Sequence, residues 1–385
     1  MSQPMSRILE KLNVEIPPRP VAGQLAAFWG NQQDRLASAL AECVPHGSRA
    51  IYVDYPIHGN VGDQMLMLAS ECWFQRSGLE ILGRWHVDNF RFPKLPPGTI
   101  ILCNAGGNMG DLYRYQRHRE AIVRSYPGHR IVFLPQAIYY RDPERLRRSA
   151  EIMRQHGDLH LFLRDRRSFE LACAEFATTT VTLAPDMAVF LYPLHHTLNH
   201  EFGRIEPRYD VIYLMRRDWE WTNVTPVPKS RRRVGLPDVL SLINPFWKRG
   251  RPVSIFTSEK AACIDWFETA PIEMYLAWTI LGVVFLVGKV LPAAPFCRGW
   301  QRLARRMVIR AAAAVLGCEC LVTNRLHAHL MACLLDTPNV LLDNNYGKCS
   351  AYFKTWHLEL PLCRFLDQGI ATANGSDMKG VKAIL

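Results

Sequence analysis

The sequence predicts an α/β protein with two doubly wound domains that face each other across a cleft. Short apolar strands alternate with longer helical patterns, which is typical of parallel sheets covered by helices on both faces. The alternation occurs in two sets, separated by a polar stretch at 195–209. A chain of 385 residues is also too long for one ordinary core and about right for two domains.

The first domain is expected over residues 50–195, after an N-terminal leader or helical extension at 1–49. Its strands are apolar, β-branched and bounded by turn residues, as buried parallel strands are. They are AIYVDY (50–55), GTIILCN (98–104), HRIVFLPQ (129–136) and DLHLFLR (158–164), and VTLAPDMAVFLYPL (181–194) closes the set. Helical patterns lie between them, such as DPERLRRSAEIMRQHG (142–157), which ends in a glycine.

The second domain is expected over residues 205–365. It repeats the alternation, and helices are expected between its strands. The strands are DVIYLMRRD (210–218), RPVSIFTSE (251–259), CECLVTN (318–324) and PNVLLDN (338–344).

One segment of the second domain, 274–310, interrupts this regular pattern. MYLAWTILGVVFLVG (274–288) is fifteen residues without a charge. As a helix it would span about 22 Å, which is short of the roughly 30 Å hydrocarbon core of a bilayer. The following CRGWQRLARRMVIRA (297–311) predicts a basic amphipathic helix, with Trp300, Leu303 and Met307 opposite a face of arginines. The arginines are Arg298, Arg302, Arg305, Arg306 and Arg310. The pattern favours an interfacial anchor on an anionic membrane surface through 274–310, and a buried core helix with a solvated arginine face is the alternative.

The overall charge indicates an anionic partner. The net charge is +11 and the pI is near 9.2, which fits a phosphorylated substrate, a membrane surface or nucleic acid. No nucleic-acid recognition motif accompanies the arginines, so we expect no nucleic-acid partner. The eleven cysteines include no CxxC pair, so neither a disulfide framework nor a zinc site is expected. The N-terminus has no apolar signal core, and we expect a cytoplasmic chain.

The segment Gly-Asn-x-Gly-Asp occurs twice, as GNVGD (59–63) and GNMGD (107–111). Each copy follows a predicted strand and precedes a helix, so both are expected at carboxyl ends of parallel strands, where open α/β sheets bind ligands. Glycine permits a close backbone approach, and asparagine amides can bind sugar hydroxyls. The aspartates can cap the following helices, and a pair of plain tight turns is the alternative. We predict ligand-binding roles for four side chains: Asn60, Asp63, Asn108 and Asp111.

A second informative stretch is TNRLHAHLMACLLDTPNVLLDNNYGK (323–348). A helix that is apolar on nearly every side is expected from about Leu326 to Leu335, and such a helix is buried. His327 lies in its first turn, where free N–H groups and the positive end of the dipole attract an anion. Arg325, just before it, can bind a carboxylate or phosphate through two hydrogen bonds. His329 lies about 200° further around the helix and is expected to be a satisfied core histidine.

Arginines also follow two other predicted strands. YLMRRDWEW (213–221) offers Arg216 and Arg217, and LFLRDRRSF (161–169) offers Arg164, Arg166 and Arg167. Paired arginines at such positions suit a compact polyanion, although exposed arginines at strand ends are common. Local pairing with Asp165 makes the second group the weaker candidate.

Taken together, these stretches resemble the polysaccharide pyruvyl transferase family. The resemblance covers about residues 50–357, and the leader and 258–310 fall outside the typical pattern. It is carried, in order, by HGNVGDQ, GGNMGDLY, RIVFLPQAIYY, LRDRRSFELA, APDMAV, TNRLHAHLMACLLDTPNVLLDNNYGK and the closing TW. It implies two Rossmann-like, doubly wound domains in a GT-B-like arrangement. It also implies phosphoenolpyruvate as donor and co-substrate, with no further cofactor. It also implies a hexose in a lipid-linked oligosaccharide as acceptor, a cyclic pyruvate ketal as product, and a place in exopolysaccharide biosynthesis.

The resemblance also implies roles for individual residues. In the family, the arginine and histidine of the RLH motif serve donor binding and catalysis, which here implies Arg325 and His327. An arginine in the first strand of the second domain is similarly implicated, which implies Arg217, with Arg216 as the alternative. Histidine suits proton transfer near neutral pH, so we expect His327 to be the general acid/base. No catalytic metal is expected, because the arginines can supply the positive charge.

Two other functions stay open at this point. A nucleotide-sugar-dependent GT-B glycosyltransferase would share the two-domain cleft. A non-catalytic membrane scaffold of polysaccharide assembly would not need His327. For a pyruvyl transferase, the N-terminal domain is expected to face the acceptor and the C-terminal domain the donor. The basic amphipathic segment leads us to expect a peripheral protein on the cytoplasmic face of the inner membrane.

Overall fold

The structure is a computed structural model, and its strands form two sheets. It describes residues 15–21, 23–176, 179–194, 205–216, 255–256, 261–264, 266, 273 and 293–366. The expected linker at 195–209 lies mostly outside these residues, as do Arg217 and the apolar run 274–288. Within the leader, a helix forms over Ala26–Cys43 (α2).

The first sheet is parallel and has the strand order β2-β1-β3-β5-β6-β7, with β4 paired to β5. β1 and β3 are in register from Ala50 opposite Ile100 to Val53 opposite Cys103, so they end side by side. The two Gly-Asn-x-Gly-Asp segments follow these adjacent ends. The strands are β1 (Arg49–Val53), β2 (Glu80–Trp85), β3 (Ile100–Cys103), β4 (Gly106–Gly110), β5 (Ile131–Tyr139), β6 (Leu159–Leu163) and β7 (Thr180–Leu183).

Helices cover both faces of this sheet. Successive residues of a strand point to opposite faces, so each strand packs against helices on both sides. In β1, Tyr52 packs in the core cluster that holds α2 and α3, whereas Ile51 and Val53 pack in the cluster that holds α4, α5 and α6. The helices are α3 (Val61–Arg76), α4 (Tyr115–Ser125), α5 (Pro143–Arg154), α6 (Arg166–Glu175) and the 3-10 helix η1 (Met187–Leu191).

The second sheet has the order β13-β12-β11-β8-β10-β9, and its pairs are parallel except for β9 with β10. Leu214 of β8 lies opposite Thr323 of β11, so these two strands also end together. The strands are β8 (Tyr209–Leu214), β9 (Ile255–Phe256), β10 (Ala261–Ile264), β11 (Cys318–Thr323), β12 (Asn339–Leu342) and β13 (Cys363–Leu366). The helices are α11 (Ala293–Leu316), α12 (Leu326–Leu334) and α13 (Lys348–Trp356).

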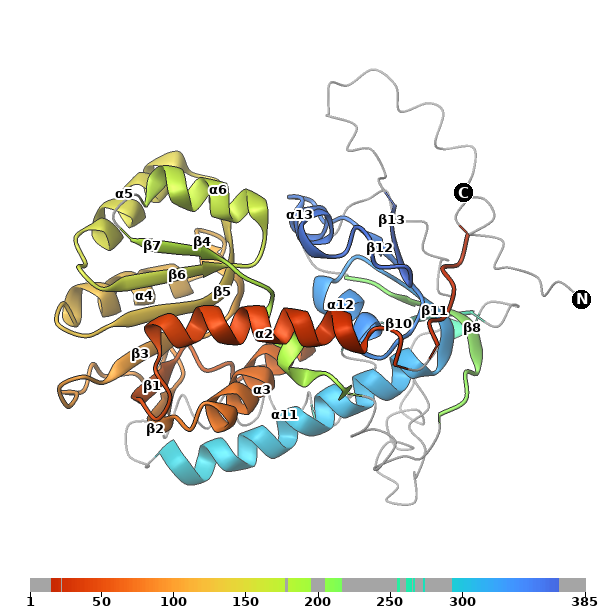
Figure 1. Ribbon diagram of the computed structural model, residues 1–385, viewed down its shortest axis with the longest axis horizontal. Helices are drawn as coiled ribbons and strands as arrows, with labels where there is room; N and C mark the ends of the chain where they lie inside the picture. Colours follow the sequence, from red (N-terminus) through yellow and green to blue (C-terminus); the bar gives the residue numbers. More distant parts are fainter. Residues whose placement is uncertain are drawn as a thin grey trace, which may run out of the picture.

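Two long helices join the halves of the molecule. Figure 1 shows that α2 and α11 both extend across the two sheets. α11 contacts α3 and β2 of the first half as well as β11 and α12 of the second. One apolar core cluster accordingly contains residues from both sheets, such as Leu102 of β3 and Leu321 of β11.

The burial of α11 corrects the expectation that its apolar face anchors the chain to a membrane. Trp300, Leu303 and Met307 are 1%, 8% and 0% exposed, and the indole N–H of Trp300 donates to the carbonyl of Pro56 at 2.9 Å. This face therefore packs on protein, as in the core-helix alternative, and the five arginines Arg298, Arg302, Arg305, Arg306 and Arg310 are exposed. Among the described residues, none of the helices is both long and apolar enough to span a bilayer.

Candidate active site

His327 lies where the two halves of the molecule meet. Arg325 is the N-cap residue of α12, and His327 is in the first turn of that helix. The His327 side chain is 13% exposed, and Arg325 is also half-buried. Gly62 of the first GNVGD segment packs directly against the ring, because a Cβ built on Gly62 would lie 2.4 Å from His327 Nδ1. The first motif and the RLH segment thus touch across the two sheets.

A buried ion pair supports the other side of the His327 ring. Arg164 follows β6 and is 1% exposed, and its Nη1 donates to Asp186 Oδ2 at 2.7 Å. The same Nη1 lies 3.2 Å from His327 Nε2, and Asp186 Oδ2 lies 3.7 Å from it. Burial would raise the pKa of Asp186, but Arg164 and the His327 ring outweigh it and hold this pKa below its usual range. A permanent carboxylate and guanidinium therefore face the imidazole.

The first motif positions its polar side chains at the start of α3. Asn60, not Asp63, is the N-cap: its Oδ1 accepts from the N–H of Gly62 at 3.0 Å. Asp63 accepts from Asn60 Nδ2 at 2.8 Å and lies 3.6 Å from His58 Nε2. The expectation that Asp63 caps this helix is wrong, because Asn60 occupies that position. Both residues are half-buried beside Gly62 and hence near His327.

The second motif is a strand rather than a turn. Residues Gly106–Gly110 form β4 against β5, and Gly110 has φ 135° with a built Cβ only 1.8 Å from Tyr139 O, so a side chain is excluded there. Asn108 Oδ1 accepts from the buried Arg119 at 2.8 Å. Asp111 accepts from the backbone N–H groups of Arg141 and Asp142 at 2.9 Å each. Asp111 therefore holds the β5–α5 turn, and the expectation that it caps α4 is wrong.

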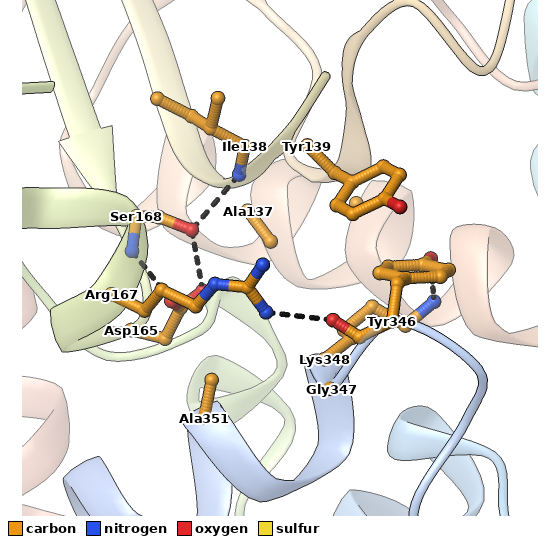
Figure 2. Close-up of a pocket in the computed structure, with 11 residues that line it drawn as sticks. Ala137, Ile138, Tyr139, Asp165, Arg167, Ser168, Tyr346, Gly347, Lys348 and Ala351 are labelled. Atoms are coloured by element: carbon orange, nitrogen blue, oxygen red, sulfur yellow. Dashed lines mark hydrogen bonds between the residues drawn. The ribbon is translucent and has the colours of Figure 1, made fainter. Parts of the chain in front are cut away.

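A small cleft, partly open to solvent, lies between the carboxyl end of the first sheet and α13. Its walls include Gly107, Arg167 and Lys348. Figure 2 shows the Arg167 guanidinium reaching across to the carbonyl of Tyr346, at 2.7 Å, and the Tyr139 and Tyr346 rings facing each other with centroids 4.6 Å apart.

Lys348 connects this cleft to the second motif. A Cβ on Gly107 would lie 2.9 Å from Arg164 Nη2 and 3.3 Å from Lys348 Cδ. Gly107 thus packs between a cation of each half of the molecule. Lys348 Nζ donates to the Tyr346 hydroxyl at 3.0 Å, and its backbone N–H is capped by Asn344 Oδ1 at 2.8 Å. The DNNYGK segment therefore shapes the start of α13 and brings a lysine to the cleft.

The remaining arginine candidates lie in different places. Arg216 follows β8, and its backbone N–H donates to the side chain of Asn324, which is next to Arg325. Arg216 therefore lies close to the RLH segment. Arg166 is exposed and its backbone N–H donates to Thr355 Oγ1 at 3.1 Å. Asp165 caps α6 by accepting from Ser168 N at 2.8 Å, and Arg164 pairs with Asp186.

From the sequence, Arg164 is one of the weaker candidates, and neither Asp186 nor Lys348 is predicted to lie at the site. All three were within segments that carry the family resemblance, LRDRRSFELA, APDMAV and DNNYGK. The structure brings them to His327 and to Gly107.

These features define a two-sheet α/β protein with a cationic cleft and the half-buried imidazole of His327, a site suited to chemistry on a small anion. The sequence profile described as polysaccharide pyruvyl transferase matches residues 60–245. A Bacillus subtilis protein named "Putative pyruvyl transferase EpsO" is 32% identical over 347 residues, which cover 88% of this chain and 94% of that protein. The chain belongs to the polysaccharide pyruvyl transferase family.

A second relative is also named as a pyruvyl transferase, and one solved structure shares the fold. Pyruvyl transferase 1 of Schizosaccharomyces pombe is 24% identical over 317 residues, which cover 79% of this chain and 68% of that protein. Among solved structures, an uncharacterized protein of Klebsiella pneumoniae superposes with a TM-score of 0.53 at 17% identity, over 87% of this chain and 98% of that one. This last similarity concerns the fold. Membership in the family supports pyruvyl transfer as the activity.

Proposed function

We propose that the chain transfers the enolpyruvyl group of phosphoenolpyruvate onto two hydroxyls of a hexose in a lipid-linked oligosaccharide. The product would be a cyclic pyruvate ketal used in exopolysaccharide biosynthesis. The observation that carries the proposal is the position of His327, which packs on Gly62 and contacts the buried Arg164–Asp186 pair. The family membership supplies the pyruvyl group as the unit transferred.

The reaction balances without a redox partner. A proton added to C3 of phosphoenolpyruvate makes a methyl group and leaves C2 electrophilic. The first sugar hydroxyl bonds to C2 and loses its proton, the bond from C2 to the phosphate oxygen breaks, and the second hydroxyl takes that place and loses its proton. One of the two released protons replaces the one used at C3, and the other leaves with inorganic phosphate. A group that gives and takes protons near neutral pH suits these steps, and His327 is that group in the proposal.

The cations around His327 match the charges of the donor. Phosphoenolpyruvate carries a carboxylate and a phosphate on three carbons, and each charge-assisted hydrogen bond contributes on the order of 1.5–3 kcal/mol. In the proposal, Arg325 and either Arg216 or Arg217 hold the donor from the second half of the molecule. Lys348 adds a charge from the cleft wall. Arg164 keeps the imidazole in place, because its guanidinium is already committed to Asp186.

The first half of the molecule would receive the sugar. Asn60, Asp63 and Asn108 are half-buried beside the strand ends that lead to His327, and their amides and carboxylate suit hexose hydroxyls. Asp111 would contribute to this acceptor side through the β5–α5 turn that it holds.

Phosphate release from phosphoenolpyruvate, with and without a lipid-linked oligosaccharide, tests this function. We expect acceptor-dependent release by the wild type and none by His327→Ala. The matched control is His160→Ala, which removes a partly buried histidine that also contacts an aspartate, Asp158 at 2.9 Å, on the first sheet. Turnover of a nucleotide sugar instead of phosphoenolpyruvate would favour the glycosyltransferase. Undiminished function of His327→Ala would favour the scaffold.

We also propose that membrane association, if it accompanies the lipid-linked acceptor, uses charge rather than the apolar face of α11. Arg298, Arg302 and Arg306 are exposed at i, i+4 and i+8 of this helix, and such a row attracts anionic headgroups at about 1 kcal/mol for each arginine. The triple change of these residues to glutamate is expected to abolish sedimentation with anionic vesicles and to leave phosphate release with a soluble acceptor intact. Unchanged sedimentation would contradict this part of the proposal.

A further inference from the structure

Four side chains of the kinds that bind metal ions lie close together in the interior, at α12 and the end of α13. His329 and Cys333 are four residues apart on α12, His357 is the C-cap residue of α13, and Cys363 begins β13. Their exposed fractions are 0%, 0%, 1% and 1%. One potential ligand atom from each of the four lies within 4.8 Å of those of the other three. Residues from three separate elements therefore point at one small volume.

The distances are close to those of a tetrahedral site. Zinc bonds of about 2.0 Å to nitrogen and 2.3 Å to sulfur place two nitrogens about 3.3 Å apart, and a nitrogen and a sulfur about 3.5 Å apart. Here His329 Nε2 and His357 Nδ1 are 2.8 Å apart, which is a hydrogen-bond distance that an ion between them would lengthen. Cys333 Sγ lies 3.9 Å from both of these atoms. Movements of about half an ångström would bring these atoms to tetrahedral separations, whereas a thiol at 3.9 Å makes only a weak hydrogen bond to an imidazole.

A fifth residue orients the ligands as outer-shell residues of metal sites do. Asn339 Oδ1 lies 2.6 Å from His329 Nδ1, which fixes the proton on Nδ1 and leaves Nε2 directed at the cluster. The amide Nδ2 of Asn339 also donates to Cys333 Sγ at 3.4 Å, a contact that stabilises a thiolate. One side chain thus prepares a nitrogen ligand and a sulfur ligand together.

We propose that His329, Cys333, His357 and Cys363 bind one zinc ion, a structural site that is separate from the pyruvyl-transfer chemistry. Two thiolates and two neutral imidazoles form a common closed zinc coordination sphere, and their charges balance Zn²⁺ in a buried environment. Binding forms two zinc–sulfur and two zinc–nitrogen bonds and releases the two thiol protons to solvent, with no change of oxidation state.

The proposed ion would fix the helix that carries the active site. α12 begins at the residues of the RLH segment and reaches the cluster one to two turns later, so the ion ties this helix to the end of α13 and to β13. The position of His327 against Gly62 then depends on a bonded connection as well as on packing. The proposal differs from the expectation that the chain has no zinc site. That expectation was based on the lack of CxxC pairs, whereas these four ligands come from three separate elements.

Elemental analysis of the full chain, expressed in zinc-supplemented medium and purified under reducing conditions, tests the proposal. We expect one zinc ion per chain in the wild type, loss of zinc in Cys333→Ala and Cys363→Ala, and retention in Cys103→Ala, which removes an equally buried thiol from the first sheet. Chelation by a strong zinc ligand is expected to lower the melting temperature of the wild type and of Cys103→Ala.

Cobalt substitution of the wild-type chain keeps the test independent of whether the variants fold. A thiolate-to-cobalt charge-transfer band, with the intense visible bands of tetrahedral cobalt, is expected if the cluster binds metal. Wild-type protein without zinc and without these bands would overturn the proposal. Zinc retained in both cysteine variants, or a Cys333–Cys363 disulfide in the purified protein, would also overturn it. None of these readouts uses phosphoenolpyruvate, so they do not depend on the proposed function.

Discussion

The substitution Gly62→Ala tests the contact between the first motif and His327. A Cβ at this position would lie 2.4 Å from His327 Nδ1, whereas an ordinary contact begins near 3.4 Å, so the ring must retreat by about 1 Å. Because Arg164 lies on the other side of the ring, this retreat would compress the 3.2 Å contact between Arg164 Nη1 and His327 Nε2. A displacement of about 1 Å at a catalytic group can lower the rate by about 100-fold. Overpacking of a buried position costs about 1–3 kcal/mol in the free energy of unfolding.

Gly30→Ala is the matched control, because Gly30 lies in α2 and a Cβ there meets nothing within 4 Å. It should keep full activity and raise the free energy of unfolding by about 0.5–1 kcal/mol through helix propensity. Phosphate release from phosphoenolpyruvate and urea unfolding measure both effects. A His327→Ala background removes the ring but keeps the Cβ of residue 327, which lies 2.9 Å from the built Cβ, so Gly62→Ala should cost less stability there than in the wild type. Wild-type activity of Gly62→Ala would refute the contact on which the proposed site depends.

Three further predictions concern the surroundings of the site. In steady-state assays, Lys348→Met should raise the KM for phosphoenolpyruvate at least tenfold. Lys354→Met, at an exposed position of the same helix, should leave this KM unchanged. Equal KM values for the two variants would exclude donor binding by Lys348. Asp186→Asn leaves the buried Arg164 guanidinium without its carboxylate, so urea unfolding at neutral pH should show a loss of about 3–5 kcal/mol, and a loss below about 1 kcal/mol would contradict a buried ion pair. Burial lowers the pKa of His86 from 6.5 to about 4. As the pH falls, the unfolded chain therefore binds a proton at this histidine before the folded chain does. The free energy of unfolding should then decrease by up to about 3 kcal/mol between pH 6.5 and 4. His86→Asn should remove this part of the pH dependence, and parallel curves for the two proteins would contradict it.

The strands that could be predicted are those whose own residues specify them. β1, β3, β5 and β6 are continuous apolar segments between turn residues, and each formed where expected. β4 has the sequence GGNMG, which is typical of a turn, and it becomes a strand because it pairs with β5. β2 was missed because EILGRW lies at the sheet edge, where its alternating polar residues are half-exposed. Tertiary pairing decided both cases.

The interpretation of α11 failed for a related reason. Its periodicity specifies an apolar face and a basic face, but not what covers the apolar one. A bilayer and the helices of another domain bury Trp300 equally well, and only the fold shows that Pro56 accepts its indole hydrogen bond. The linear sequence contains no information of that kind.

In the candidate site, the chemistry of single residues was predictable and their partners were not. His327 and Arg325 stood out because they lie at the start of a helix that is otherwise largely apolar. The partners of His327, Arg164 and Asp186, are 163 and 141 positions away in the chain, so local patterns cannot connect them. The metal cluster left one local signal, since His329 and Cys333 share a helix face at i and i+4, but His357 and Cys363 join them only through the packing of α12 against the end of α13.

Transfer carried out in D₂O tests the central claim most directly, because ketal formation requires a solvent-derived proton at C3 of the donor. Wild-type protein is incubated with phosphoenolpyruvate and the lipid-linked oligosaccharide, and the product is measured by mass spectrometry and NMR. We expect an oligosaccharide heavier by pyruvate less one water, with a single deuterium in its CH₂D methyl group, and no such product from His327→Ala. A product that retains an undeuterated methylene, or a sugar transferred from a nucleotide with phosphoenolpyruvate left intact, would contradict proton delivery by His327 to this donor.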